Sequence, residues 1–146
     1  MMQSPHTLIG LGDGGAHVGI ISDGSFPTSL LAHWGRDRRD GRLDVSWLVK
    51  RHTLDNARAV GLNDRGMIAP GYKADLNVID FDNLTLSPPR MVHDLPAGGK
   101  RLMQDAHGYL HTVVSGVETY RDGNETGARP GQLIRGPQAD RAEASA

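Results

Sequence analysis

The spacing of apolar positions changes along the chain, from helix-like in the first part to strand-like after residue 70. Leu30, Leu31 and Trp34 recur at intervals that place them on one face of a helix. Ser25 is a candidate N-cap for this helix and Gly35 a candidate end, because short polar residues cap helices and glycine often terminates them. The pattern therefore predicts a helix that buries two leucines and a tryptophan.

Two shorter helices are expected to follow. Residues 45–52 have helical spacing behind a cap at Asp44 or Ser46, and residues 55–60 end at Gly61. Both stretches are bounded by the residue types that start and stop helices, so the sequence predicts two consecutive short helices here.

The run RDRRDGR at residues 36–42 separates the first helix from the next two. A run of mixed charges is typical of a solvated surface loop, and that is our interpretation. The alternative is an anion contact through Arg36 or Arg38.

Beyond a turn-rich connection at residues 61–71, alternating apolar positions predict strands. Residues 84–89 are extended and end at two prolines, and residues 91–102 are expected to form a loop because they contain Pro96 and Gly98-Gly99. The predicted strands cover residues 74–81, 108–115 and 117–121, with turns at Gly116 and at Asp122-Gly123.

The stretch TLIGLGDGGAH at residues 7–17 is the centre of the functional interpretation. A short apolar run bounded by glycine is typical of a buried parallel strand, and α/β sheets place their chemistry at the carboxyl ends of such strands. Asp13 falls at that end, among glycines that let the backbone turn and approach a ligand closely. The alternative is structural: Asp13 makes an Asx turn and the glycines only shape a loop.

Composition excludes several classes of function. The 146 residues carry 16 basic and 17 acidic side chains, so the sequence offers no basic surface for nucleic acid or an acidic membrane. There are no cysteines, which excludes disulfides and thiolate metal sites and is compatible with the cytoplasm. No apolar run approaches the ~18 residues of a membrane span.

A high glycine content of 19 residues and an aromatic share of only 5% favour a piece of a larger fold over an independent small domain. The apolar run at residues 7–9 points the same way, because a parallel strand needs neighbours on both sides and only a short polar segment precedes it.

Residues 53–80, TLDNARAVGLNDRGMIAPGYKADLNVID, resemble the closing segment of the metal-dependent amidohydrolase superfamily. The matching features are the helix ending in Asn56-Ala57-Arg58, then Arg65-Gly66, Pro70-Gly71 and Ala74-Asp75-Leu76. Further segments look like the D-aminoacylase branch, which comprises N-acyl-D-amino-acid deacylases: residues 10–17, 25–27, 33–34, 93–99 and 114–131.

The resemblance implies an α/β plus β fold. Residues 1–65 would supply the last strand and helices of a (β/α)8 barrel, residues 66–136 the C-terminal strands of a small β-sandwich, and residues 137–146 a disordered tail. The family also needs metal-binding histidines on segments that do not match this sequence. The chain is therefore expected to be a C-terminal part of an enzyme and inactive alone.

The resemblance also assigns chemistry to Asp13, which matches the family's acid at the end of the last barrel strand. That acid ligates the metal, takes a proton from the metal-bound water and passes it to the departing nitrogen. The resemblance further implies that the complete enzyme holds Zn2+ and that this chain alone holds none. It also implies that the substrate is a small N-acyl amino acid. His17 would either face the substrate or hold the loop. The other histidines show no zinc-like spacing: His6, His33, His52, His93, His107 and His111.

Two further functions remain open from the sequence. One is hydrolysis of another amide, such as a cyclic one, because the substrate-selecting residues would lie mostly outside this chain. The other is a non-catalytic, β-rich interaction or assembly domain. An upstream reading frame that encodes the family's histidines would favour the enzyme.

We predict that the isolated chain associates, with itself or with a missing N-terminal part, or is loosely ordered before Val45. A barrel strand without neighbours leaves backbone donors and apolar side chains uncovered. Light scattering and amide exchange test this prediction. A monomer whose amides exchange slowly throughout residues 7–13 would contradict it.

Overall fold

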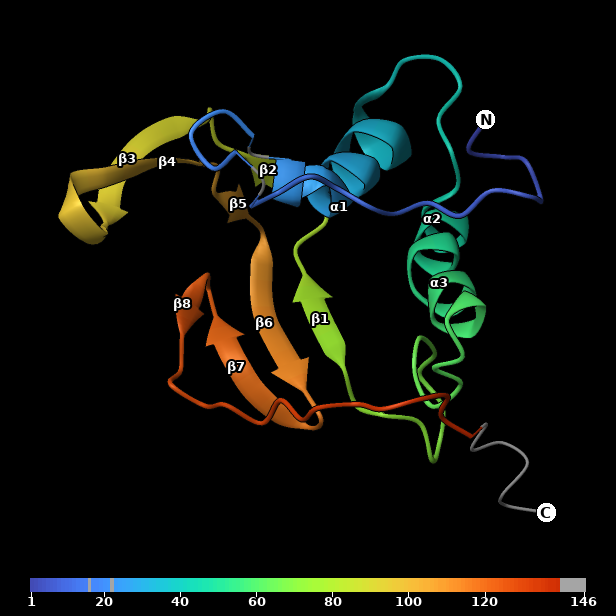
Figure 1. The fold of residues 1–146 in the computed structure, drawn as a ribbon. Coiled ribbons are helices and arrows are strands. Elements are labelled where there is room, and N and C mark those ends of the chain that lie inside the picture. The colour runs from blue at the N-terminus through green and yellow to red at the C-terminus, as the bar shows by residue number, and fades with distance from the viewer. Residues whose placement is uncertain (16, 22, 140–146) are drawn as a thin grey trace.

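The computed structural model describes residues 1–15, 17–21 and 23–139. The α-helices lie before residue 60 and the strands after residue 75, so the change of period predicted from the sequence is confirmed (Figure 1). The barrel and sandwich to which these parts are assigned, with a boundary near Gly66, stay predictions.

The first helical run consists of η1 (Asp23–Ser25), α1 (Phe26–Ser29) and η2 (Leu30–Asp37). Ser25 occupies the predicted N-cap position of α1, but its hydroxyl donates to the side chain of Gln104 in the β-rich part. The predicted apolar face is confirmed, because Leu30 is buried and Leu31 and Trp34 pack against the same cluster.

Gly35 does not end this helix, which continues to Asp37. A Cβ atom at Gly35 would lie 3.1 Å from Cγ2 of Val45 and 3.3 Å from Cδ1 of Leu48. The glycine therefore allows the close approach of two helices, a role that local sequence cannot distinguish from termination.

The second helical pair is α2 (Val45–His52) and α3 (Leu54–Ala59), close to the predicted bounds. Asp44 is the cap of α2, since its carboxylate accepts from the backbone N–H of Trp47 at 2.7 Å. A small core joins this pair to the first helical run. Its buried members are Ile9, Leu30 and Leu48, with Met2, Leu31, Trp34, Leu43 and Trp47 packed around them.

The apolar run at residues 7–9 is not a strand, contrary to the prediction. Its carbonyl groups bond to side chains of α2 and α3 in place of a neighbouring strand: Arg51 donates to the Thr7 carbonyl and Asn56 to the Ile9 carbonyl, the latter at 2.7 Å. These donors hold the run against α2 and α3, and only Ile9 in it is buried.

Four antiparallel strands form the main sheet, in the order β1 (Leu76–Ile79), β6 (Tyr109–Val114), β7 (Val117–Arg121) and β8 (Asn124–Glu125). The first three agree with the predicted strands, and the turns at Gly116 and at Asp122-Gly123 fall between strands as expected. A two-stranded pair, β2 (Thr85–Leu86) with β5 (Ala106–His107), lies above the sheet in the view of Figure 1.

The expected loop at residues 91–102 is instead an antiparallel hairpin of β3 (Arg90–Leu95) and β4 (Gly99–Met103), joined by η3 (Pro96–Gly98). The turn places two consecutive residues at positive φ, Ala97 at 58° and Gly98 at 73°. Arg101 and Asp94 pair across the strands at 2.6 Å. Proline and glycine therefore mark a turn between strands here.

The connection from helices to strands is fixed at Gly66. Its φ is +86°, and a Cβ there would lie 2.8 Å from Cα of Leu54 at the start of α3. Near the start of the expected tail, the N–H of Gln138 donates to the Gly61 carbonyl at 2.7 Å and Gln138 bridges to Leu62. Residues 140–146, the rest of that tail, lie outside the described residues.

Arg36 joins the helical and β-rich parts. Its guanidinium donates to the Phe81 carbonyl, to the Asp82 carbonyl at 3.0 Å and to the Leu84 carbonyl at 2.7 Å. Arg36 also pairs with Asp37, and this hydrogen bond raises the pKa of Arg36 above its ordinary value. The charged run is thus not wholly solvated, and the groups that Arg36 contacts are mainly carbonyls of this chain. Arg38 stacks over the Trp34 ring, 4.1 Å from its centroid.

Within the described ranges, none of the helices combines the length and apolar composition needed to cross a membrane.

We predict that Arg36→Met lowers the free energy of unfolding by about 2 kcal/mol, because it leaves three carbonyl groups without their charged donor. Urea denaturation followed by tryptophan fluorescence measures the loss. Arg39→Met, at an exposed position of the same charged run, is the matched control and should change stability little. Equal stability of both variants would show that Arg36 does not hold the two parts together.

Candidate functional site

Asp13 lies in the loop between the extended segment at residues 7–10 and η1. Asp13 is exposed to solvent, and its backbone N–H donates to Oδ2 of Asp23 at 2.7 Å. In the part of the chain that the structure describes, no hydrogen bond to the Asp13 carboxylate is seen. The carboxylate therefore faces solvent, while the backbone beneath it is held by a second acid.

The glycines around Asp13 pack closely against this chain itself, and their predicted approach to a ligand stays a prediction. A Cβ at Gly12 would lie 3.1 Å from Cδ1 of Phe26, and one at Gly14 would lie 3.0 Å from the backbone nitrogen of Gly24. The loop thus packs tightly against the beginning of the first helical run, and larger residues would push it away.

His17 lies in the same loop, and its residue is exposed. Its φ of 44° is in the left-handed region, and its carbonyl accepts from the N–H groups of Ile20 at 2.9 Å and Ile21 at 3.3 Å. The contribution visible in the structure is therefore a backbone turn. The substrate-binding role of His17 stays a prediction.

Two side chains support the segment that leads to Asp13. The Ile9 carbonyl accepts from Nδ2 of Asn56 at 2.7 Å and faces Nδ1 of His52 at 3.3 Å. Because a carbonyl can only accept, that contact requires the His52 proton on Nδ1. His52 also packs edge-on against Phe26, with ring centroids 5.4 Å apart. These residues set the direction in which the chain enters the loop.

The sequence interpretation missed Asp23, Asn56 and His52 as parts of this site. Asn56 belongs to the Asn56-Ala57-Arg58 motif. That motif indicated the family but did not predict the contact between Asn56 and Ile9. Asp23 and Asp13 are ten residues apart, and no local spacing predicts that they meet.

The described residues do not form a complete metal site. No group of three or more His, Asp or Glu side chains within residues 1–15, 17–21 and 23–139 is arranged to hold an ion. Asp23 meets the backbone of Asp13 and not its carboxylate, and one oxygen of Asp23 accepts from that backbone N–H. A structural or catalytic zinc needs three or four protein ligands. Any tightly held zinc would thus require ligands from outside these residues.

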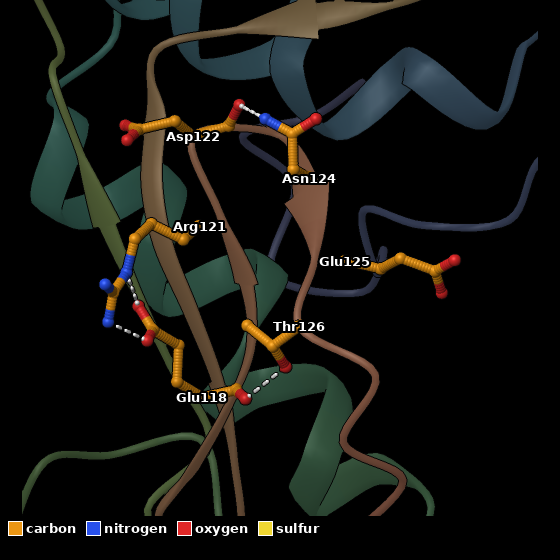
Figure 2. Close-up of a pocket in the computed structure, with 6 residues that line it drawn as sticks. All are labelled: Glu118, Arg121, Asp122, Asn124, Glu125 and Thr126. Atoms are coloured by element: carbon orange, nitrogen blue, oxygen red, sulfur yellow. Dashed lines mark hydrogen bonds and ion pairs between the residues drawn. The ribbon is translucent and has the colours of Figure 1, made fainter.

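Apart from the Asp13 loop, a hollow lies on the β7–β8 hairpin, lined by Glu118, Arg121, Asp122, Asn124, Glu125 and Thr126 (Figure 2). Glu118 pairs with Arg121 at 2.5 Å and with Nδ1 of His111 at 2.6 Å. Hydrogen bonds from Arg121 and His111 lower the pKa of Glu118 from its ordinary 4.5 to about 2. The residues that line this hollow all come from the β7–β8 hairpin, and none of them belongs to the Asp13 loop.

The family model described as "Amidohydrolase family" matches residues 1–120. The chain belongs to the amidohydrolase family. The match includes the Asp13 loop, all the helices and the strands up to most of β7.

Curated relatives agree with this assignment. "Adenine deaminase 2" of Rhizobium meliloti is 34% identical over 130 residues, which are 80% of this chain and 20% of that protein. The "5-methylthioadenosine/S-adenosylhomocysteine deaminase" of Desulfitobacterium hafniense is 36% identical over 78 residues, 47% of this chain and 18% of that protein. "Adenine deaminase 1" of Rhizobium meliloti is 39% identical over 59 residues, 37% of this chain and 10% of that protein.

The chain thus spans about a fifth or less of the length of these relatives. No solved structure matches it. What the comparisons show for this chain is its family. The relatives named above are deaminases, so the D-aminoacylase branch, zinc and the barrel stay predictions.

We predict that the stabilising effect of Glu118 disappears in acid. Because the pKa of Glu118 is lower in the folded chain, its pairing stabilises the fold fully above pH 4.5 and is lost as the pH falls through about 2. Denaturation midpoints of the wild type and Glu118→Gln should therefore differ at neutral pH and converge near pH 2. A difference that does not change with pH would contradict this.

Proposed function

We propose that this chain is the C-terminal segment of a zinc-dependent amidohydrolase that hydrolyses the amide bond of N-acyl-D-amino acids, with Asp13 as its acid/base. The observation that carries the proposal is the placement of Asp13. It is an exposed acid in a tightly packed glycine loop, inside the residues that match the family. The D-aminoacylase substrate rests on the motifs at residues 10–17, 25–27 and 93–99.

The proposed chemistry needs a carboxylate that can gain and lose a proton within one turnover. Asp13 suits this role because its carboxylate faces solvent while its backbone is anchored. It would accept a proton from the water that attacks the acyl carbon. It would then give that proton to the nitrogen that leaves when the C–N bond breaks.

Zinc enters the proposal only as part of the complete enzyme, with ligands supplied from outside this chain. When bound, such a metal acidifies its water and polarises the carbonyl group. The contribution of these 146 residues is the acid and the loop that holds it. The partner we propose for the complete enzyme is a small N-acyl amino acid.

A second candidate function is deamination of a purine, favoured by the names of the relatives. The proton would follow the same route through Asp13, since attack by water at a ring carbon is followed by loss of ammonia. The two candidates differ in the substrate and in the nitrogen that leaves. The family match favours both over the non-catalytic assembly domain.

The test uses the longest protein encoded by the reading frame that contains these 146 residues. We expect it to hold zinc and to release amino acid from N-acetyl-D-amino acids, whereas the 146-residue chain does neither. Release of ammonia from adenine, with no deacylation, would replace the first candidate by the second. Stoichiometric zinc and turnover from the 146 residues alone would overturn the proposal.

In the longer protein, Asp13→Asn should reduce kcat by about 10²–10⁴-fold, because an amide keeps the shape of the side chain but cannot accept the proton. Asp40→Asn, at an exposed position of the charged run, is the matched control and should retain activity. Full activity of Asp13→Asn, with zinc still bound, would remove Asp13 from the mechanism.

A further inference from the structure

Asp23 contacts the backbone of Asp13 and not its side chain. The acceptor is a carboxylate oxygen of Asp23 and the donor is the backbone N–H of Asp13, at 2.7 Å. A hydrogen bond from an amide to a carboxylate is charge-assisted and stronger than one between neutral groups. The Asp13 side chain remains outside this contact.

Both oxygens of Asp23 lie beneath the glycine loop. A Cβ at Gly12 would lie 3.3 Å from Oδ2 of Asp23, and one at Gly14 would lie 3.6 Å from Oδ1. The chain from Gly12 to Gly14 therefore wraps closely around this carboxylate. Asp13 is the central residue of that wrap, so the position of its Cα depends on Asp23.

Asp23 itself starts an anchored element. It is the first residue of η1, which continues into α1 and η2. Behind it, the hydroxyl of buried Thr28 bonds to that of Tyr109 at 2.8 Å, and Leu30 is buried in the core. The acceptor is thus tied to the helical core, while the donor lies in a loop without regular structure.

We propose that Asp23 is the positioning residue for Asp13. By holding the backbone N–H of Asp13, it fixes the place from which the Asp13 carboxylate reaches the reacting atoms. This inference rests on the proposed acid/base role of Asp13. Asp23 acts through a single accepted hydrogen bond, so an asparagine, which keeps an acceptor oxygen, can replace it, and an alanine cannot.

The first experiment measures amide exchange with water at Asp13 by NMR in the longer protein. In Asp23→Ala, the Asp13 amide should exchange about tenfold faster than in the wild type, whereas in Asp23→Asn the change should be under about threefold. Asp40→Asn is the matched control for the loss of one charge. Equal exchange in Asp23→Ala and the wild type would overturn the inference whether or not the longer protein is an enzyme.

The second experiment measures kinetics in the longer protein. Asp23→Ala should lower kcat by about tenfold or more with KM nearly unchanged, and Asp23→Asn should restore most of kcat. Loss of turnover in Asp23→Asn as complete as in Asp13→Asn would make Asp23 a catalytic group and overturn the positioning role. Absence of all turnover in the wild type would refute the proposed function, and the amide exchange would then decide what Asp23 does.

Discussion

The guanidinium of Arg36 is the contact on which the arrangement of this chain depends. It stands at the end of the first helical run and donates to carbonyl groups of residues 81, 82 and 84, between β1 and β2. A guanidinium presents five donors in a fixed plane to several carbonyls at once, whereas the three donors of a lysine rotate about one nitrogen. In the described residues, the largest side chains that are fully buried are Leu48 and Leu84, so polar contacts of this kind add to a small amount of buried apolar packing.

Side-chain donors that bond backbone carbonyls also position the segment that leads to Asp13. The segment at residues 7–10 has no sheet neighbour in the described structure, yet its carbonyls are bonded by side chains of α2 and α3. Side chains from the following helices therefore direct the chain toward the loop, and Asp23 fixes the loop beyond it. Asp13 is held from both sides through backbone groups only, which leaves its carboxylate available.

The sequence predicted those features that depend on neighbours in the chain. The bounds of α2 followed from the period of its apolar residues and from Asp44, and β1, β6 and β7 from alternation. It failed where distant contacts decide. Residues 7–9 resemble a strand, but strand formation requires a partner, and Gly35 is a contact point between helices that resembles a terminator. The β3–β4 hairpin was mistaken for a loop because its turn contains proline and glycine. Of the site, the sequence indicated Asp13 but had no signal for Asp23.

The contact of Gln138 with Gly61 and Leu62 has a mechanical consequence. Residues 63–137 contain β1 to β8, and the chain enters and leaves this stretch at neighbouring points. To stretch residues 63–137 from their two ends, a pull along the chain would therefore first have to separate Gln138 from Gly61 and Leu62.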